Sequence, residues 1–194
     1  MPKKYSEIER ENIRAALRRE ASKCLSKYGV KRTTVDELVK GASIAKGTFY
    51  LFYDSKESLF LDLIECFSSE SERMYLEMLQ ELDENHIVTS LTDVFMAILM
   101  KFHRDGIYRF LSDNQLELVL RKSKRVGEKD SLILKIDALK SLFSYFYIDN
   151  EEDIESFRSA FRAILYILLH AEEIDGMEKA LRFIIRGLVL QMVE

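Results

Sequence analysis

The sequence contains very few residues that interrupt helices. Its 194 residues include 1 proline, Pro2, at the start of the chain, and 7 glycines. Proline removes a backbone hydrogen bond and clashes with the preceding helical turn, and glycine raises the entropic cost of ordering the chain. Since 47% of the residues are hydrophobic and can form a core, this scarcity predicts an all-α protein.

Other features that the sequence lacks bear on the compartment in which the protein is expected. The two cysteines, Cys24 and Cys66, each lie on the apolar stripe of a predicted helix, so we expect reduced core residues and neither a disulfide nor a metal site. The N-terminus is polar and charged, unlike a signal peptide. The longest apolar run, Ala163 to Leu169, is too short to cross a bilayer. We therefore expect a cytoplasmic protein without a membrane partner.

Signatures of catalysis are missing as well. The sequence has no Gly-rich phosphate loop, zinc-ligand spacing, Cys/His pair or nucleophile elbow. We predict no catalytic residues, no metal and no cofactor. A small helical enzyme is the least favoured interpretation, because it would need a cleft with converging titratable groups.

The charges that are present divide unevenly along the chain. Residues 1–56 hold 13 Lys and Arg against 7 Asp and Glu, a balance of +6, and the remainder has a balance of −10 within the total of −4. A basic N-terminal part on an acidic body is typical of a DNA-contacting domain joined to a domain with another role. A chance imbalance on solvated helices is the alternative.

The most informative stretch runs from Thr33 to Phe60. Thr34 and Glu37 have the spacing of a capping box, which predicts a helix start. Apolar residues then follow at helical spacing, residues 42–45 make a tight turn, and a second short helix is predicted over residues 46–52. This is the layout of a helix-turn-helix, whose second helix enters the DNA major groove.

Within this stretch, three runs carry a family resemblance: 46–50 (KGTFY), Phe52-Tyr53, and 55–59 (SKESL). They resemble the TetR family of transcriptional regulators. The resemblance implies an N-terminal three-helix helix-turn-helix domain over residues 1–53. It also implies a C-terminal helical domain for regulation and dimerisation over residues 54–194, with about nine helices in all. The chain has Ser43 and Ala45 where the family often has Gly and a Ser or Thr cap.

The predicted DNA contacts follow from geometry and from this resemblance. Lys46 and Thr48 begin the second helix and are placed to touch base edges, and Gly47 lets the backbone approach closely. Tyr50 resembles the family tyrosine that meets a phosphate. The helix starts add phosphate contacts, so the predicted DNA-binding residues are Thr33, Thr34, Lys46, Gly47, Thr48, Tyr50 and Lys56. The expected partner is a palindromic double-stranded DNA operator.

The remaining helices are predicted from apolar spacing. The expected helices cover residues 7–28, 55–82, 90–103, 107–111, 114–124, 129–147 and 151–173, followed by a last helix after Gly176. The last two helices are apolar on several sides, which requires a covering partner. The resemblance makes that partner a second copy, with an interface at Phe157, Phe161, Ile164, Leu168, Leu181, Ile185, Leu188 and Met192. The alternative is a monomer whose core holds both helices.

The resemblance also places a small effector inside the C-terminal domain. A pocket there should be mostly apolar with a few polar groups. The candidate lining residues are Phe95, Leu99, Phe102, His103, Tyr108, Tyr145, Tyr166 and His170. Their aromatic character favours an aromatic or lipophilic effector and a regulator, most simply a repressor, that responds to it. A C-terminal domain that binds a partner protein is the alternative.

Overall fold

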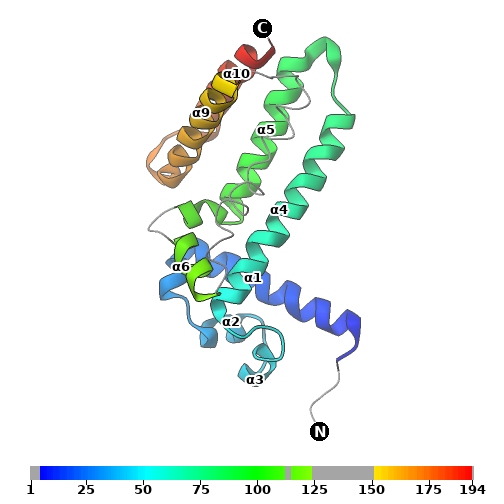
Figure 1. Cartoon of the computed structure of the whole chain (residues 1–194), viewed down its shortest axis with the longest axis vertical. Coiled ribbons are helices and arrows are strands. Elements are labelled where there is room, and N and C mark those ends of the chain that lie inside the picture. The colour runs from blue at the N-terminus through cyan, green and yellow to red at the C-terminus, as the bar shows by residue number, and fades with distance from the viewer. Residues whose placement is uncertain (1–4, 112–114, 124–150, 194) are drawn as a thin grey trace. The chain divides into compact units, whose positions relative to one another are not determined.

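The computed structural model describes residues 5–111, 115–123 and 151–193. Every regular element in this part of the chain is a helix, which confirms the all-α class (Figure 1). The helix predicted over residues 129–147 lies outside the described residues. The chain divides into two compact units, Met1–Phe67 with Asp105–Leu132, and Ser68–Arg104 with Ile133–Glu194. The long helix α4 (Lys56–Gln80) contributes to both units.

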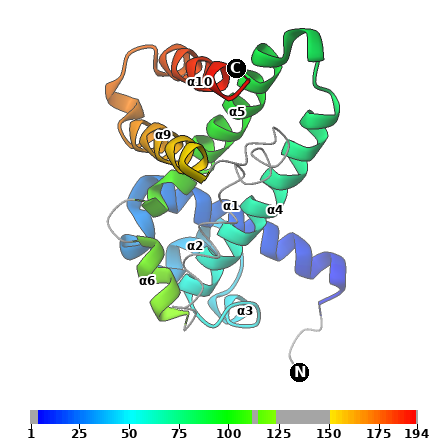
Figure 2. The same ribbon diagram turned by 45° about the horizontal axis from the view of Figure 1, so that its top comes forward.

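The first unit contains the N-terminal helices and a later segment that packs with them. Helix α1 contacts α2, α6 and the 3-10 helix η2, and α2 contacts α3 (Figures 1 and 2). The elements are α1 (Glu7–Arg32), α2 (Val35–Gly41), α3 (Lys46–Phe49), the first turns of α4, η2 (Ile107–Leu111) and α6 (Gln115–Lys122). The helix-turn-helix therefore lies in the same unit as α6, a segment well beyond the predicted boundary at residue 53.

Helix α1 begins after a Ser6 cap and bends at a glycine. Ser6 and Glu9 form a capping box. Helical geometry is interrupted at Gly29, whose φ of 71° is the left-handed value that favours glycine. The Gln115 side chain lies against this position and accepts a hydrogen bond from the Val30 N–H. A Cβ at Gly29 would lie 2.5 Å from Gln115 Nε2, so both conformation and packing require glycine here.

The first unit is held together by an apolar core drawn from several helices. Each side chain that reaches 0% exposure contributes about 1.5–3 kcal/mol through burial. These residues include Leu17 and Leu25 of α1, Leu38 of α2, Phe49 of α3, and Phe60 and Ile64 of α4. Both cysteines are free; Cys24 is buried, whereas Cys66, which was expected in the core, is half-buried. This shared core fixes α3 relative to α1 and α4.

The second unit contains the rest of α4 and the later helices η1 (Glu84–His86), α5 (Ile87–Arg104), α9 (Glu151–Leu169), η4 (Ala171–Glu173) and α10 (Met177–Val193). Helices α5 and α10 pack together, and Arg182 donates to Asp93 at 2.6 Å. Phe95 and Phe161 place their rings 6.0 Å apart, which joins α5 to α9. Within the described residues, no helix combines the length and hydropathy needed to span a membrane.

Several helix boundaries differ from the predictions, among them those of α5 and α9. Helix α5 begins at Ile87 and not at Ser90, because the polar break before it forms the 3-10 turn η1 and leads directly into the helix. Helix α9 ends at Leu169 and not at Glu173. His170, with φ −110° and ψ 18°, leaves the helical region, and a 3-10 turn follows. Residues 170–173 are His, Ala, Glu and Glu, so the apolar spacing already ends at Leu169, and Ile87 and Val88 are apolar residues that precede the predicted start of α5.

Candidate nucleic-acid interface

The helix-turn-helix is formed by α2, a four-residue turn and α3. Thr34 and Glu37 make the predicted capping box at the start of α2. Hydrogen bonds from the Thr34 side chain and backbone lower the pKa of Glu37. In the turn, Ser43 has a φ of 55° and is the one non-glycine residue with positive φ among the described residues. The sequence thus places a strained residue where glycine would fit without steric strain.

Helix α3 is shorter than predicted. It ends at Phe49, with Tyr50 as its C-cap, whereas the sequence predicted a helix to residue 52. The chain continues in tight turns, since the Leu51 N–H bonds to Thr48 O and the Phe52 N–H bonds to Phe49 O. Ala45 at the N-cap provides no side-chain hydrogen bond. Helix α3 is therefore one turn fixed mainly by the burial of Phe49.

The outer face of α3 carries the residues predicted to contact DNA. Lys46 and Gly47 are exposed and Thr48 is half-buried. Tyr50 is 51% exposed. A Cβ added at Gly47 would meet no atom within 4 Å, so the space in front of this residue is open. These four residues form one accessible surface on α3 and its C-cap.

Lys46 has a carboxylate partner in the helix before it. Its Nζ lies 2.9 Å from Asp36 Oδ1, and both side chains are more than half exposed. This hydrogen bond raises the pKa of Lys46, so the ammonium is charged at neutral pH. An exposed ion pair of this kind exchanges easily with solvent or with another anion.

The N-terminal arm contacts α3, which the sequence did not indicate. Tyr5 places its hydroxyl 3.4 Å from Thr48 Oγ1 and its ring 6.0 Å from the ring of Phe52. Arg10 and Arg14 also lie over the Phe52 ring, at 5.0 and 5.8 Å from its centroid. Tyr5 directly precedes the Ser6 cap, and an apolar residue at this position often packs on nearby side chains. Its position was therefore the one feature of the sequence that could have predicted this contact.

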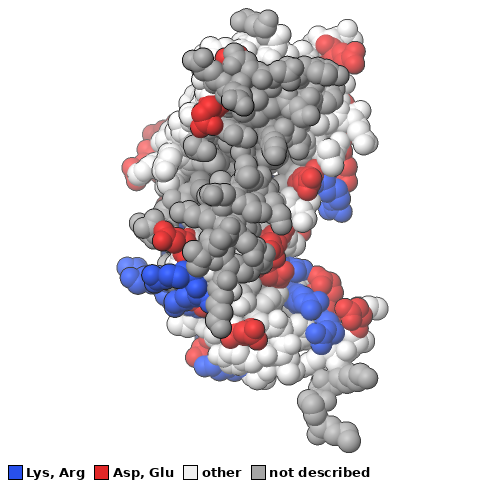
Figure 3. Space-filling model, viewed as in Figure 1, with Lys and Arg blue, Asp and Glu red and all other residues white. Residues whose placement is uncertain are grey.

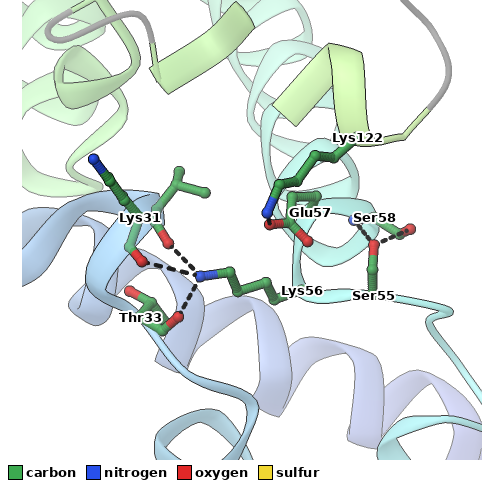
Figure 4. A network of polar contacts seen from close by, with 8 residues as sticks. Lys31, Thr33, Ser55, Lys56, Glu57, Ser58 and Lys122 are labelled. Carbon is green, nitrogen blue, oxygen red and sulfur yellow. Dashed lines mark hydrogen bonds and ion pairs between the residues drawn. The ribbon is translucent and has the colours of Figure 1, made fainter. Parts of the chain in front are cut away.

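Two of the predicted phosphate-binding residues have structural partners. Thr33 is 1% exposed and donates to Gly29 O at 2.8 Å. Lys56 Nζ donates to Val30 O at 2.8 Å and Thr33 O at 2.6 Å, and it lies 3.3 Å from Lys31 O (Figure 4). Burial lowers the pKa of Lys56. Both residues therefore tie α4 to the end of α1, whereas Thr34 stays exposed at the start of α2.

A partly buried polar network fixes the chain after α3. Tyr53 is 8% exposed, and its hydroxyl donates to Asp62 Oδ2 at 2.5 Å. Arg18 of α1 donates to the same oxygen at 3.2 Å. Burial and the bond to Asp62 raise the pKa of Tyr53. The sequence left the role of Tyr53 open, and the structure gives it a positioning role between α3 and α4.

The residues predicted to line an effector pocket do not all belong to one compact unit. Phe95, Leu99 and Phe102 are buried on α5 in the second unit, and His103 is half-buried there. Tyr108 is buried in the first unit. Tyr166 is 61% exposed, and His170 is exposed beside Glu173. Tyr145 lies outside the described residues.

The residues predicted for the dimer interface are mostly covered within the chain. The group includes the buried residues Ile164, Leu168, Leu181, Ile185 and Met192 and the half-buried Phe157, Phe161 and Leu188. Other apolar residues of these helices are exposed, led by Phe183 at 83%, Tyr166 at 61% and Ile184 at 42%. A groove of about 240 Å³ runs between α9 and α10, lined by Ala160, Ile164, Ile184, Gly187, Leu188 and Gln191.

Comparison with known proteins gives one consistent result. The sequence profile of the family described as "Bacterial regulatory proteins, tetR family" matches residues 17–63, which include α2, α3 and the start of α4. A crystal structure of a TetR family transcription regulator from Marinobacter aquaeolei VT8 has the same fold. It covers 96% of this chain and 98% of its own, with a TM-score of 0.58 and 16% sequence identity.

Three relatives from Bacillus subtilis (strain 168) are each described as an uncharacterized HTH-type transcriptional regulator. YhgD is 27% identical over 145 residues, which cover 70% of this chain and 66% of YhgD. YuxN is 28% identical over 128 residues, covering 63% and 43% of the two chains. YdgC is 26% identical over 147 residues, covering 74% and 72%. The matched region thus covers less than two thirds of the length of YhgD and of YuxN.

Proposed function

Because the chain belongs to the TetR family of transcriptional regulators, we propose that it is a homodimeric repressor that releases its operator when a small molecule binds. It would act on DNA in the cytoplasm, through binding and not through catalysis. The observation that carries the proposal is the accessible surface of α3, where Lys46, Gly47 and Tyr50 are exposed together.

The chemistry of this surface suits a major groove. Lys46 donates to guanine acceptors, and Thr48 donates, accepts or packs its methyl group on thymine. Tyr50 is exposed, and its hydroxyl group suits a phosphate oxygen, whereas the Thr34 hydroxyl already donates to Glu37. On the face shown in Figure 3, most Lys and Arg side chains lie over the first unit, which would attract the DNA backbone.

A second copy of the chain is the proposed cover for the exposed face of α9 and α10. Apolar side chains of this size are seldom left in water on one contiguous surface. Phe183 and Ile184 project from α10, and the neighbouring groove passes Gly187, where an added Cβ would meet no atom within 4 Å. A side chain of the partner would fill this groove, and two-fold pairing would suit a palindromic operator.

The effector proposal is supported by a buried polar group in the second unit. Ser71 is 4% exposed, and within the described part of the chain its hydroxyl has no hydrogen-bond partner. Buried polar groups normally have one. An aromatic or lipophilic molecule with one polar group would satisfy Ser71 while it packs on apolar neighbours. To act as a switch it must bind the DNA-free arrangement more tightly than the DNA-bound one.

A binding-site selection from random duplex DNA tests the DNA and dimer proposals together. We expect an inverted repeat whose half-sites lie about one helical turn apart. Sedimentation of the same protein should give a dimer, and Ile184→Glu should convert it to a monomer. Leu76→Glu is the matched control, because Leu76 is similarly exposed on α4, at 48% against 42% for Ile184. A monomeric wild-type protein, or a selected site without symmetry, would contradict the proposal.

A further inference from the structure

The first unit contains a pocket that is separate from α3. It has a volume of about 440 Å³ and lies where the end of α1 and the start of α4 meet α6. The chemistry of its lining is dominated by charged side chains, namely Lys31, Lys56, Glu57, Glu117, Arg121 and Lys122. Concave sites of this size bind small molecules.

Four cations and two carboxylates line this pocket, so positive charge is in excess. Lys56 is occupied by backbone carbonyls at the end of α1. Lys122 donates to Glu57 at 3.2 Å, and Glu57 is only 5% exposed (Figure 4). In the part of the chain that the structure describes, the side chains of Lys31 and Arg121 have neither a hydrogen bond nor an ion pair, and both residues are exposed. The excess cations are therefore available to a ligand.

We propose that this pocket binds a small molecule that carries a carboxylate or phosphate group. The Arg121 guanidinium presents a planar set of N–H donors that bonds such groups in pairs. Lys31 supplies a second charge from α1, and Lys122, whose side chain is 53% exposed, adds positive charge at the rim while it stays paired with the buried Glu57. The buried Glu57 limits how deep a negative group enters, so the oxyanion lies near the rim between Lys31 and Arg121.

A small ligand fits these observations better than the DNA backbone does. Helix α6 packs on α1 and η2, whereas α3 packs on α2. The cations surround a hollow and are not spread along a flat or convex surface that could follow a duplex. A ligand here would also contact the first residues of α4, Lys56 and Glu57, within the same compact unit as the helix-turn-helix. The site is therefore distinct from the effector site proposed for the second unit.

Calorimetric titration of the full chain with pyrophosphate and with citrate, at constant ionic strength, tests the proposal. We expect saturable binding of at least one probe, and the stronger of the two identifies phosphate or carboxylate as the preferred group. Arg121→Gln should weaken that binding about 10-fold, the loss typical of a charged hydrogen-bonding partner. Glu117→Gln should strengthen it about 3-fold, because it removes a negative charge from the lining.

Arg73→Gln is the matched control, because Arg73 is an exposed arginine of α4 outside this pocket. It should leave binding of the probe unchanged. The absence of saturable binding by both probes, or an equal loss in Arg73→Gln and Arg121→Gln, would overturn the proposal. So would a loss of operator affinity in Arg121→Gln without any loss of probe binding, because the pocket cations would then serve DNA. Operator binding by the wild type is also measured without probe. If the wild type binds its operator but binds neither probe, the pocket proposal fails and the proposed function stands.

Discussion

The Lys46 ammonium lies 2.9 Å from the Asp36 carboxylate, so the first residue of α3 is paired with a residue of the preceding helix. Both side chains are largely exposed, and such pairs contribute only about 0.2–1 kcal/mol to stability. The pairing therefore matters more for DNA binding than for folding. To donate to a base, Lys46 must share or leave Asp36, whose charge also repels the phosphates nearby.

Removing that carboxylate should strengthen operator binding. We expect Asp36→Asn to raise affinity about 3–10-fold at ~0.1 M salt, since it releases Lys46 and removes one negative charge from the interface. Fluorescence anisotropy with a labelled operator measures the effect. Asp93→Asn, which makes the same charge change at an exposed ion pair of the second unit, is the control and should have little effect. Weaker binding by Asp36→Asn would show instead that Asp36 orients Lys46 for the DNA.

The turn of the helix-turn-helix should become more stable with glycine at residue 43. Ser43 has a φ of 55°, and this conformation costs a residue with a Cβ about 1–2 kcal/mol. Part of the gain is offset by the greater freedom of glycine in the unfolded chain. We expect Ser43→Gly to raise the free energy of unfolding by about 0.5–1 kcal/mol in urea denaturation.

Ser55→Gly is the comparison for this substitution. Ser55 Oγ accepts a hydrogen bond from the Ser58 N–H at the start of α4, and its backbone does not have positive φ. This variant should be slightly less stable than wild type, because it loses a cap and gains only unfolded-state entropy. Equal effects of the two substitutions would contradict the strain assigned to Ser43.

The capping box at α2 predicts a pH dependence with a definite sign. The Thr34 hydrogen bonds lower the pKa of Glu37 in the folded state, so its carboxylate stabilises the fold above the unfolded value of about 4.3. That contribution is lost as the pH falls through the folded value. We expect Glu37→Gln to be less stable than wild type at pH 7 and to lose less stability on acidification. Urea denaturation at pH 7 and about pH 3.5 measures this, and parallel losses in both proteins would contradict it.

Local signals predicted much of the fold. The capping boxes at Ser6 and Thr34 both form, because each needs only residues three apart in the sequence. Leu38 and Phe49 are apolar residues of the predicted helix-turn-helix, and both lie in the core. The end of α3 was wrong, because the chain turns after Phe49 and brings Tyr53 to Asp62 of α4. That contact depends on tertiary packing, which periodicity does not contain.

The candidate site was predictable only in part for the same reason. The exposure of Lys46 and Tyr50 followed from helical geometry, but Lys56 binds backbone carbonyls that carry no sequence signal. In the last helices, nearly every face is apolar, so the sequence did not distinguish the inner from the outer face. The structure buries Ile185 and exposes Phe183, and only the packing of α10 on α5 separates them.

If α3 contacts the operator bases, a Lys46→Ala variant should lose operator affinity. Anisotropy titrations should use the selected inverted repeat and a scrambled duplex, with Lys179→Ala of α10 as a control for the loss of one exposed charge. We predict that Lys46→Ala weakens binding to the inverted repeat about 10-fold or more. It should also reduce the ratio of affinities for the inverted repeat and the scrambled duplex. Lys179→Ala should bind both duplexes as the wild type does. Wild-type affinity and selectivity in Lys46→Ala would mean that α3 does not contact the operator bases.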